Sequence, residues 1–434
     1  MADDLPPVQK AKIAMEALSV EAEGRSIPPL RSLTLDLPPS CIEFCPGLPE
    51  YFVVGTYNLQ KESEDPGAVA GDDTGDDGEQ QQAAKSVQTR DGSLVLFKLT
   101  ETNDVKHIQT IPYPSAILDL HFHPEREGRT VFAVVSSTGT LSFFRLISGE
   151  GSEVSLKEII TQRPLGVDEG VLFLSCSWHP HIPEVLAITT SNYQVHILQI
   201  DESWNAHKIC DEPVITHTLE AWTVAFSPLA PQNPEHLTIF SGGDDSKLIS
   251  RKCHFFPEQI HSEDDSIKTP WARIPMVGHE AGVTAILPLD MKIDSLNCVV
   301  ITGSYDDRIR VFSMHDFYTF VSRSGILAEK NLQGGVWRLK LINLQKTIKE
   351  EEGQEGFRWT ARILASCMHA GSRVLEISGD ATSKSCEIKV LGRFEEHKSM
   401  NYGSDFQPGS EHGDGKLRCI STSFYDRLLC LWEY

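Results

Sequence analysis

The chain has 434 residues, of which 40% are hydrophobic and 23% charged, and this composition excludes a wholly disordered protein. Its 61 acidic and 39 basic side chains give a net charge of −22, which argues against direct binding of nucleic acid. A membrane span needs about eighteen consecutive apolar residues, and no stretch of the sequence is nearly that long, so no membrane insertion is expected. None of the ten cysteines forms a C-x-x-C pair, so we expect reduced thiols in a cytoplasmic protein without metal or cofactor.

The first part of the chain divides into a tail, a strand and a later insert. Residues 1–29 are expected to be an N-terminal tail with a short helix over residues 8–18. The segment LRSLTLDL at 30–37 has the composition of a strand. Residues 62–89 contain eight acids and almost no large apolar side chain, so they cannot bury enough surface to fold. They are interpreted as a disordered acidic insert within the first repeat.

From residue 30 onward one pattern recurs: an apolar strand ending near proline, a second β-rich run, a polar turn and a further alternating run. The turn residues of the seven copies are Asn58, Thr138, Asn192, Asp245, Asp306, Ala370 and Asp426. Equal spacing of short strand sets predicts an all-β fold, a single seven-bladed β-propeller over residues 30–434. Because the last copy ends on the strand DRLLCLWEY, we expect residues 30–37 to supply its outer strand and close the ring.

The fifth repeat carries the most diagnostic residues. His279 precedes its first strand, and Ser304-Tyr305-Asp306 ends its second. In WD-repeat propellers such a His and Asp hydrogen-bond with a strand Ser or Thr, and the sequence resembles that family here. It departs from the family by ending blades in Phe312-Ser313, Leu375-Glu376 and Trp432-Glu433 instead of Trp-Asp. This resemblance implies a fold and no particular function.

Two positions of each blade are expected to meet on one face of the propeller. The residues before the turn are Tyr57, Ser137, Ser191, Asp244, Tyr305, His369 and Tyr425. The residues at the start of the innermost strands are Ser40, Leu118, Leu174, Trp222, Gly282, Trp337 and Tyr402. We therefore expect six aromatic rings and a carboxylate on this face. Such a group fits a quaternary ammonium, which is held by ring quadrupoles and negative charge. The alternative is that the rings pack in the core or bind a peptide by shape.

Two sets of reactive side chains belong to the same face. Cys367 and His369 are two residues apart, so a thiol and a base would point to the same side of a strand. The alternative is a buried structural cysteine beside a surface histidine. His397 and Ser399 lie in the loop before the seventh blade and form a second candidate pair, with Asp426 as the acid. The alternating histidines of HFHP at 121–124 are interpreted as structural.

Several longer strings are similar to a branch of the WD-repeat family, the diphthine methylesterases or diphthine methyltransferases. These strings are FSGGDDSKL, TGSYDDRIRVF, LQGGVWRLK, ASCMHAG, EEHKSMNYGSDF and STSFYDRLLCLWEY, and they extend over the seven blades. The resemblance implies a step of diphthamide biosynthesis, hydrolysis of the methyl ester of methylated diphthine on translation elongation factor 2. The protein partner would be elongation factor 2, and we expect the chain to be a monomer. A non-catalytic scaffold that recruits elongation factor 2 or a trafficking complex is the alternative.

The trimethylammonium group of this substrate matches the aromatic residues. Our hypothesis is that Trp222, Tyr305 and Trp337 surround it, that Asp244 balances its charge, and that Tyr57, Tyr402 and Tyr425 extend the binding surface. His369 would be the base that activates water or the Cys367 thiol. Arg338, next to Trp337, would polarise the ester carbonyl, or would instead form an ion pair between blades.

Overall fold

The computed structural model describes residues 23–59, 90–125, 129–149, 153–168, 170–229, 236–256, 267–269, 273–295, 297–315, 325–348, 356–410 and 416–434. The helix expected at 8–18 and the acidic insert at 62–89 lie outside these ranges. Every helix or strand assigned within the described ranges is a strand. Within the same ranges, no helix is long and apolar enough to span a membrane.

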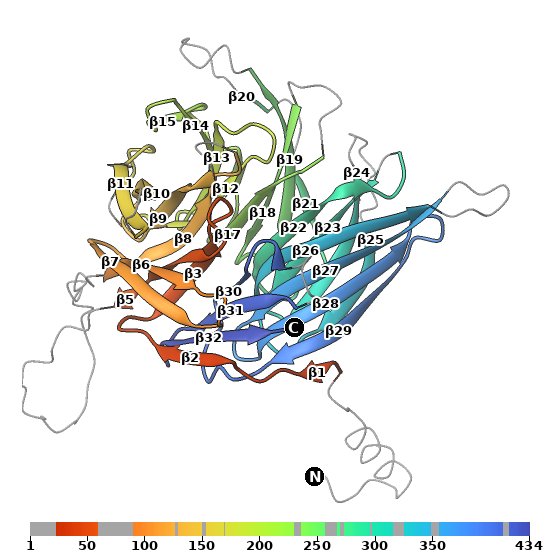
Figure 1. Cartoon of the computed structure of the whole chain (residues 1–434). Coiled ribbons are helices and arrows are strands. Elements are labelled where there is room, and N and C mark those ends of the chain that lie inside the picture. The colour runs from red at the N-terminus through yellow and green to blue at the C-terminus, as the bar shows by residue number, and fades with distance from the viewer. Residues whose placement is uncertain are drawn as a thin grey trace, which may run out of the picture.

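The strands form seven sheets that follow one another around a ring (Figure 1), which confirms the seven-bladed propeller. Blade 1 contains β3 (Pro39–Phe44), β4 (Tyr51–Thr56), β5 (Asn58–Leu59), β6 (Arg90–Leu99) and β7 (Val105–Tyr113). Blade 2 contains β8 (Ile117–Phe122), β9 (Val131–Ser136), β10 (Leu141–Ile147) and β11 (Ser155–Gln162). Blade 3 contains β12 (Phe173–Trp178), β13 (Val185–Thr190), β14 (Gln194–Ile200), β15 (Ala206–Lys208) and β16 (Ile215–Thr216). Blade 4 contains β17 (Ala221–Phe226), β18 (His236–Gly243), β19 (Leu248–Phe255), β20 (Ile267–Lys268) and β21 (Ile274–Met276).

The remaining three blades contain the longer strands and the closure. Blade 5 contains β22 (Val283–Lys292), β23 (Asn297–Ser304), β24 (Arg308–His315) and β25 (Gly325–Asn331). Blade 6 contains β26 (Val336–Ile348), β27 (Phe357–Cys367), β28 (Gly371–Asp380), β29 (Ser385–Phe394) and β1 (Arg25–Ser26). Blade 7 contains β30 (Gly403–Phe406), β31 (Arg418–Ser423), β32 (Leu428–Glu433) and β2 (Arg31–Thr34). Each innermost strand contacts those of the neighbouring blades, and β30 contacts β3, so the ring is continuous.

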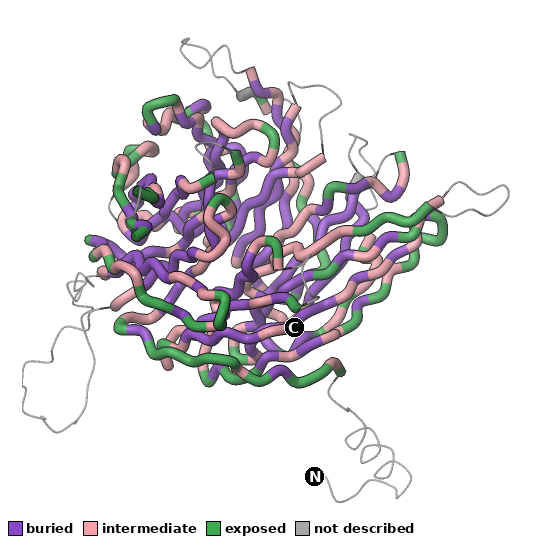
Figure 2. Tube along the Cα trace, in the orientation of Figure 1, coloured by how far each residue is buried: buried purple, intermediate pink, exposed green. Residues whose placement is uncertain are grey.

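The burial of each strand follows from its place in the blade (Figure 2). The second strands β4, β9 and β13 are buried at every position. Both faces of such a strand pack on neighbouring blades, and this explains near-continuous apolar runs such as VFAVVS. Outer strands such as β7 and β11 instead have mostly exposed or partly buried positions. The hydrophobic core therefore lies between blades and surrounds a central channel.

The N-terminal segment closes the ring, as the sequence predicts. β2 pairs antiparallel with β32, with Arg31 opposite Leu431, and becomes the outer strand of blade 7. β1 lies within the range assigned to the tail and pairs parallel with β29 of blade 6. Glu23 also forms an ion pair with Lys330 of blade 5. The segment that begins at residue 23 therefore connects blades 5, 6 and 7.

Hydrogen bonds typical of WD repeats hold several blades together. In blade 4, His217 bonds Asp245 through Nδ1 and Ser241 through Nε2, both at 2.9 Å. In blade 5, His279 Nε2 bonds Thr302 at 2.9 Å, and Asp306 accepts from the backbone of Glu280. These contacts confirm the WD-repeat resemblance at the level of the fold.

Candidate functional site

The innermost strands carry a repeated irregularity at their first positions. In blades 1 to 6 the antiparallel register shifts there, so that one extra residue is left without a partner on the second strand. The extra residues are Ser40, Leu118, Leu174, Trp222, Thr284 and Trp337. A β-bulge re-aims its side chain, and here it turns two tryptophans toward the same end of the ring. In blade 5 the position belongs to Thr284, two residues after Gly282, which corrects the sequence alignment.

The turn positions are also corrected in blades 6 and 7. The backbone N–H of Asp244 donates to Glu220, that of Tyr305 donates to Gly282, and that of Phe424 donates to Met400. Phe424 therefore takes the place assigned to Tyr425. The physical reason is turn length: Ser421, which bonds the blade histidine, precedes Asp426 by one residue more than Ser241 precedes Asp245.

In blade 6 the sequence pattern assigned the position before the turn to a residue one place too far along the chain. Cys367 pairs with Val336 as Ser304 pairs with Val283, so Met368 occupies the place of Tyr305. His369 then stands where blade 5 has its turn Asp306, and its side chain is exposed.

Seven aromatic side chains form one continuous group, here named the aromatic rim. Its members are Tyr57, Trp222, Tyr305, Trp337, Tyr402, Phe424 and Tyr425. The structure thus brings together the six aromatic residues singled out in the sequence. Phe424 also belongs to this group. Its signal in the sequence was the string SFYD, in which it directly precedes Tyr425.

Trp337 lies at the centre of the aromatic rim. Its ring centroid is 5.8 Å from Trp222, 5.7 Å from Tyr305 and 4.9 Å from Tyr402. Trp222 and Tyr305 meet edge to face at 6.2 Å, an arrangement that aromatic pairs prefer. Tyr425, in contrast, is 72% exposed and contacts the group through Phe424 at 5.1 Å. The rim therefore has a half-buried centre and an exposed margin.

A carboxylate adjoins this centre. The indole Nε1 of Trp222 donates to Asp244 Oδ1 at 3.2 Å. A Cβ on Gly282 would lie 2.7 Å from that oxygen and 3.0 Å from the ring of Tyr305, so glycine leaves room for the carboxylate beside the phenol. Burial raises the pKa of Tyr305, and nearby Tyr402 and Asp244 add to the effect, so its ring stays neutral. Rings and one negative charge thus converge from blades 4, 5 and 6.

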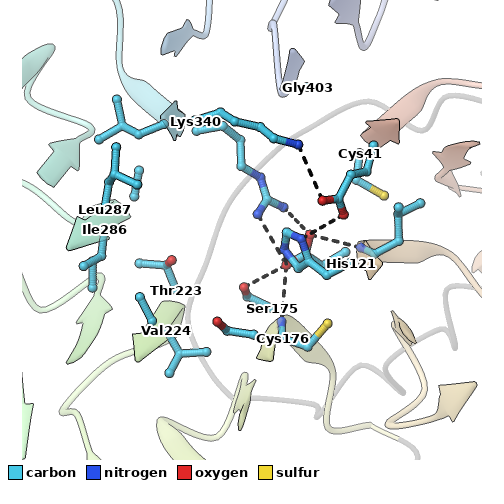
Figure 3. Close-up of a pocket in the computed structure, with 18 of the residues that line it drawn as sticks. Cys41, His121, Ser175, Cys176, Thr223, Val224, Ile286, Leu287, Lys340 and Gly403 are labelled. Atoms are coloured by element: carbon cyan, nitrogen blue, oxygen red, sulfur yellow. Dashed lines mark hydrogen bonds and ion pairs between the residues drawn. The ribbon is translucent and has the colours of Figure 1, made fainter. Parts of the chain in front are cut away.

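The central channel opens beside the rim. A cavity of about 500 Å³ is lined by Trp337 at its mouth and by Arg338 below it. Arg338 spans from blade 6 to blade 2 and bonds Asp119 twice, at 2.6 and 3.3 Å. Ser175 Oγ donates to the same carboxylate at 2.8 Å (Figure 3). Burial alone would raise the pKa of Asp119, but Arg338 and His121 outweigh it and hold the pKa well below its usual range. The interblade ion pair considered for Arg338 is therefore present.

The polar network continues along the same wall of the channel. His121 lies 3.1 Å from Glu43 and 3.3 Å from Asp119. Lys340 lies 2.7 Å from Asp405 and 3.5 Å from Glu43. Burial alone would lower the pKa of His121, but Asp119 and Glu43 raise it to about 10. Sequence reasoning missed this network because its members come from four blades. Within the described ranges, no group of three or more His, Cys, Asp or Glu residues is arranged to hold a metal ion.

The structure separates the first candidate pair of reactive residues. Cys367 is completely buried at the end of β27, and burial raises the pKa of its thiol to about 12. His369 is exposed on the turn that follows. That turn packs on the segment leading into Trp337, because Met368 Sδ lies only 2.6 Å from where a Cβ on Gly335 would be. His369 therefore lies on a turn that packs against the segment leading into Trp337, while the thiol is buried and not accessible.

The second candidate pair makes contacts within blade 7. His397 Nε2 bonds Ser421 at 2.7 Å, and Trp432 Nε1 donates to the same hydroxyl at 2.9 Å. Burial lowers the pKa of His397 to about 4, so its imidazole is neutral. Ser399 Oγ accepts from the backbone N–H of Tyr425 at 2.7 Å. Both side chains are held by these bonds, which do not join them as a nucleophile and a base.

Comparison with known proteins supplies relatives along almost the whole chain. A diphthine methyltransferase of Schizosaccharomyces pombe is 30% identical over 352 residues, which cover 80% of this chain and 87% of the relative. A diphthine methyltransferase homolog of Dictyostelium discoideum is 24% identical over 92% of this chain and 97% of its own length. A diphthine methyltransferase of Homo sapiens is 24% identical over 87% of this chain and 74% of its own length. No protein-family model matches the chain.

Proposed function

Because the chain belongs to the diphthine methyltransferase family, we propose that it hydrolyses the methyl ester of methylated diphthine on translation elongation factor 2. The products would be diphthine and methanol. One observation carries the proposal: the aromatic rim and Asp244 stand at the mouth of a polar channel. This arrangement suits a ligand that has a quaternary ammonium next to a carboxyl group.

The centre of the rim would hold the trimethylammonium group. Trp222, Tyr305 and Trp337 offer ring faces and edges within one cluster, and each ring that faces a cation contributes about 0.5–2 kcal/mol. Asp244 adds a negative charge near the cation. A trimethylammonium group has no N–H, so this attraction does not require a hydrogen bond. The net negative charge of the chain also favours the approach of a cationic group.

Hydrolysis would then occur between the turn of blade 6 and the channel mouth. His369 takes a proton from water as the oxygen attacks the ester carbonyl carbon, and a tetrahedral oxyanion forms. Arg338 donates a hydrogen bond to that oxyanion. The carbon–methoxide bond breaks, and the proton on His369 passes to the departing oxygen to give methanol and a carboxylic acid, which then loses its proton to solvent to become the carboxylate. Water is a better nucleophile here than Cys367, because a thiol with a pKa near 12 is almost fully protonated at neutral pH.

The test is the mass of elongation factor 2 that bears the ester, after incubation with the purified chain. Hydrolysis predicts a decrease equal to one methylene, whereas a scaffold would bind the protein and leave its mass unchanged. His369→Gln should slow the reaction by about 100-fold or more. The matched control is His107→Gln, which alters a histidine on the outer strand β7 and should keep the wild-type rate. A wild-type rate in His369→Gln would remove His369 as the base, and an unchanged mass with the wild-type chain would refute hydrolysis.

A further inference from the structure

The polar wall of the channel turns its cations toward the cavity and its carboxylates away from it. The side chains of Arg338, Lys340 and His121 keep 27%, 37% and 35% of their surface exposed. Those of Asp119 and Asp405 keep 1% each. The cavity therefore meets the cationic side of each ion pair, while the acids that neutralise the pairs lie behind them.

The cations are held in fixed positions by these buried acids. Arg338 is fixed by its two bonds to Asp119, and Lys340 by its contact with Asp405. His121 remains protonated at neutral pH because its pKa is about 10. Side chains that are already immobilised lose little conformational entropy when a ligand binds, and this favours pre-formed recognition of an anion.

Glu43 determines which end of the wall is most favourable to an anion. It is 16% exposed, and its carboxylate contacts His121 and Lys340. An anion beside those two cations would meet a third carboxylate. Arg338 lies at the other end, next to Trp337 in the chain, and forms its ion pair with Asp119. The Arg338 end of the wall is therefore the more favourable position.

The opposite wall of the cavity is largely apolar, with Thr223 among its hydrocarbon side chains (Figure 3). Val224, Ile286 and Leu287 lie across the channel from His121 and Lys340 (Figure 3). A ligand in this cavity would consequently contact charge on one side and hydrocarbon on the other. Such a two-sided cavity orients a carboxyl group toward Arg338.

We propose that the Arg338 end of this wall is the subsite for the carboxyl group of the ligand, and that it binds a carboxylate more tightly than a neutral acyl group. This deepens the proposed function and rests on it for the identity of the substrate. Its consequence is that the hydrolysed product is retained more strongly than the ester, with the quaternary ammonium in the aromatic rim and the carboxylate on Arg338. The preferred ligand class is a carboxylate that carries a neighbouring trimethylammonium group.

Small probes test the subsite without any reaction. Glycine betaine carries both groups, betaine amide replaces the carboxylate by a neutral amide, and tetramethylammonium carries the cation alone. Calorimetric titration of the wild-type chain should give about tenfold tighter binding of betaine than of betaine amide, the difference between a charge-assisted and a neutral hydrogen bond. Equal affinities, or no measurable binding of betaine, would overturn the proposal.

Variants assign the preference to Arg338. Arg338→Gln should bring the affinities of betaine and betaine amide within about twofold of each other and leave that of tetramethylammonium within about twofold of wild type. The matched control Lys346→Gln changes an exposed lysine at the far end of the same strand β26 and should keep the tenfold preference. If Arg338→Gln fails to fold, Arg338→Lys retains the charge but loses the paired donors and should show a reduced preference. A preference that persists unchanged in these variants would refute the role of Arg338.

The outcomes separate this proposal from the proposed function. Betaine preference without ester hydrolysis would retain the subsite and reject the reaction. Hydrolysis without betaine preference would retain the reaction and reject the subsite.

Discussion

Replacement of single rings in the aromatic rim gives a graded prediction, because the rings differ in their position. Trp337 contacts three other rings and lines the channel mouth, whereas Tyr425 is 72% exposed at the margin. Leucine keeps much of the apolar volume and removes the ring quadrupole. The variants Trp337→Leu, Trp222→Leu and Tyr425→Leu should therefore separate ring electrostatics from packing.

The magnitude follows from the strength of one cation–ring interaction. A partly desolvated ring contributes about 1–2 kcal/mol, which corresponds to roughly 5- to 30-fold in affinity. We expect Trp337→Leu to weaken binding of tetramethylammonium and lower kcat/KM at the upper end of this range. The loss of affinity in Trp222→Leu should lie lower in this range. The substitution also removes the indole N–H that donates to Asp244. Tyr425→Leu should change either quantity by about twofold or less.

The assay is kcat/KM for ester-bearing elongation factor 2, measured beside titration with tetramethylammonium. A folded-state check by circular dichroism excludes variants that lose structure. Wild-type binding of tetramethylammonium by Trp337→Leu, or a larger effect of Tyr425→Leu, would refute a cation site centred on Trp337.

Three further predictions concern the closure, the thiol and the channel. Deletion of residues 1–35 removes β2 and the buried Leu35, and should lower the free energy of unfolding by about 3 kcal/mol relative to deletion of residues 1–22; equal denaturation midpoints would contradict the closure. Cys367→Ala should keep the hydrolysis rate within about threefold, since its buried thiol stays protonated, and complete loss of activity in folded protein would restore it as nucleophile. The raised pKa of His121 means that its stabilising contribution is complete below about pH 6.5 and is lost as the pH rises toward 10, so unfolding midpoints should fall over that interval and His121→Gln should flatten the fall.

The repeat pattern predicted the fold because each blade repeats the same local requirements. An apolar inner strand, a turn with Asp or a substitute, and an alternating third strand recur at nearly constant spacing, and seven sheets result. The missing outer strand of blade 7 was predictable for a related reason. A chain that ends on β32 leaves an edge that LRSLTLDL can cover.

The register of the candidate site was less predictable, because it depends on single-residue differences in turn length. Aligning blade 7 on Asp426 selected Tyr425, while the backbone bond to Met400 belongs to Phe424. Aligning blade 6 on Ala370 likewise selected His369 in place of Met368. The two residues of each pair are adjacent in a turn. The sequence of the turn does not show which of the two occupies the position before the turn residue.

The channel network was not predictable from local patterns. Arg338 and Asp119 are separated by 219 residues, and they meet only because blades 6 and 2 face each other across the channel. His121 occurs in the motif HFHP, which gives no sign of two acidic partners on different blades. Contacts of this kind depend on ring closure, which a pattern within one blade does not encode.

In the proposed reaction, water cleaves the ester. The most direct measurement is the mass of the diphthine product formed by the wild-type chain in heavy-oxygen water. Attack of water on the carbonyl carbon predicts one heavy oxygen in the new carboxylate, together with release of unlabelled methanol. A demethylated product without heavy oxygen would contradict hydrolysis at the carbonyl and indicate that the methyl group itself is transferred.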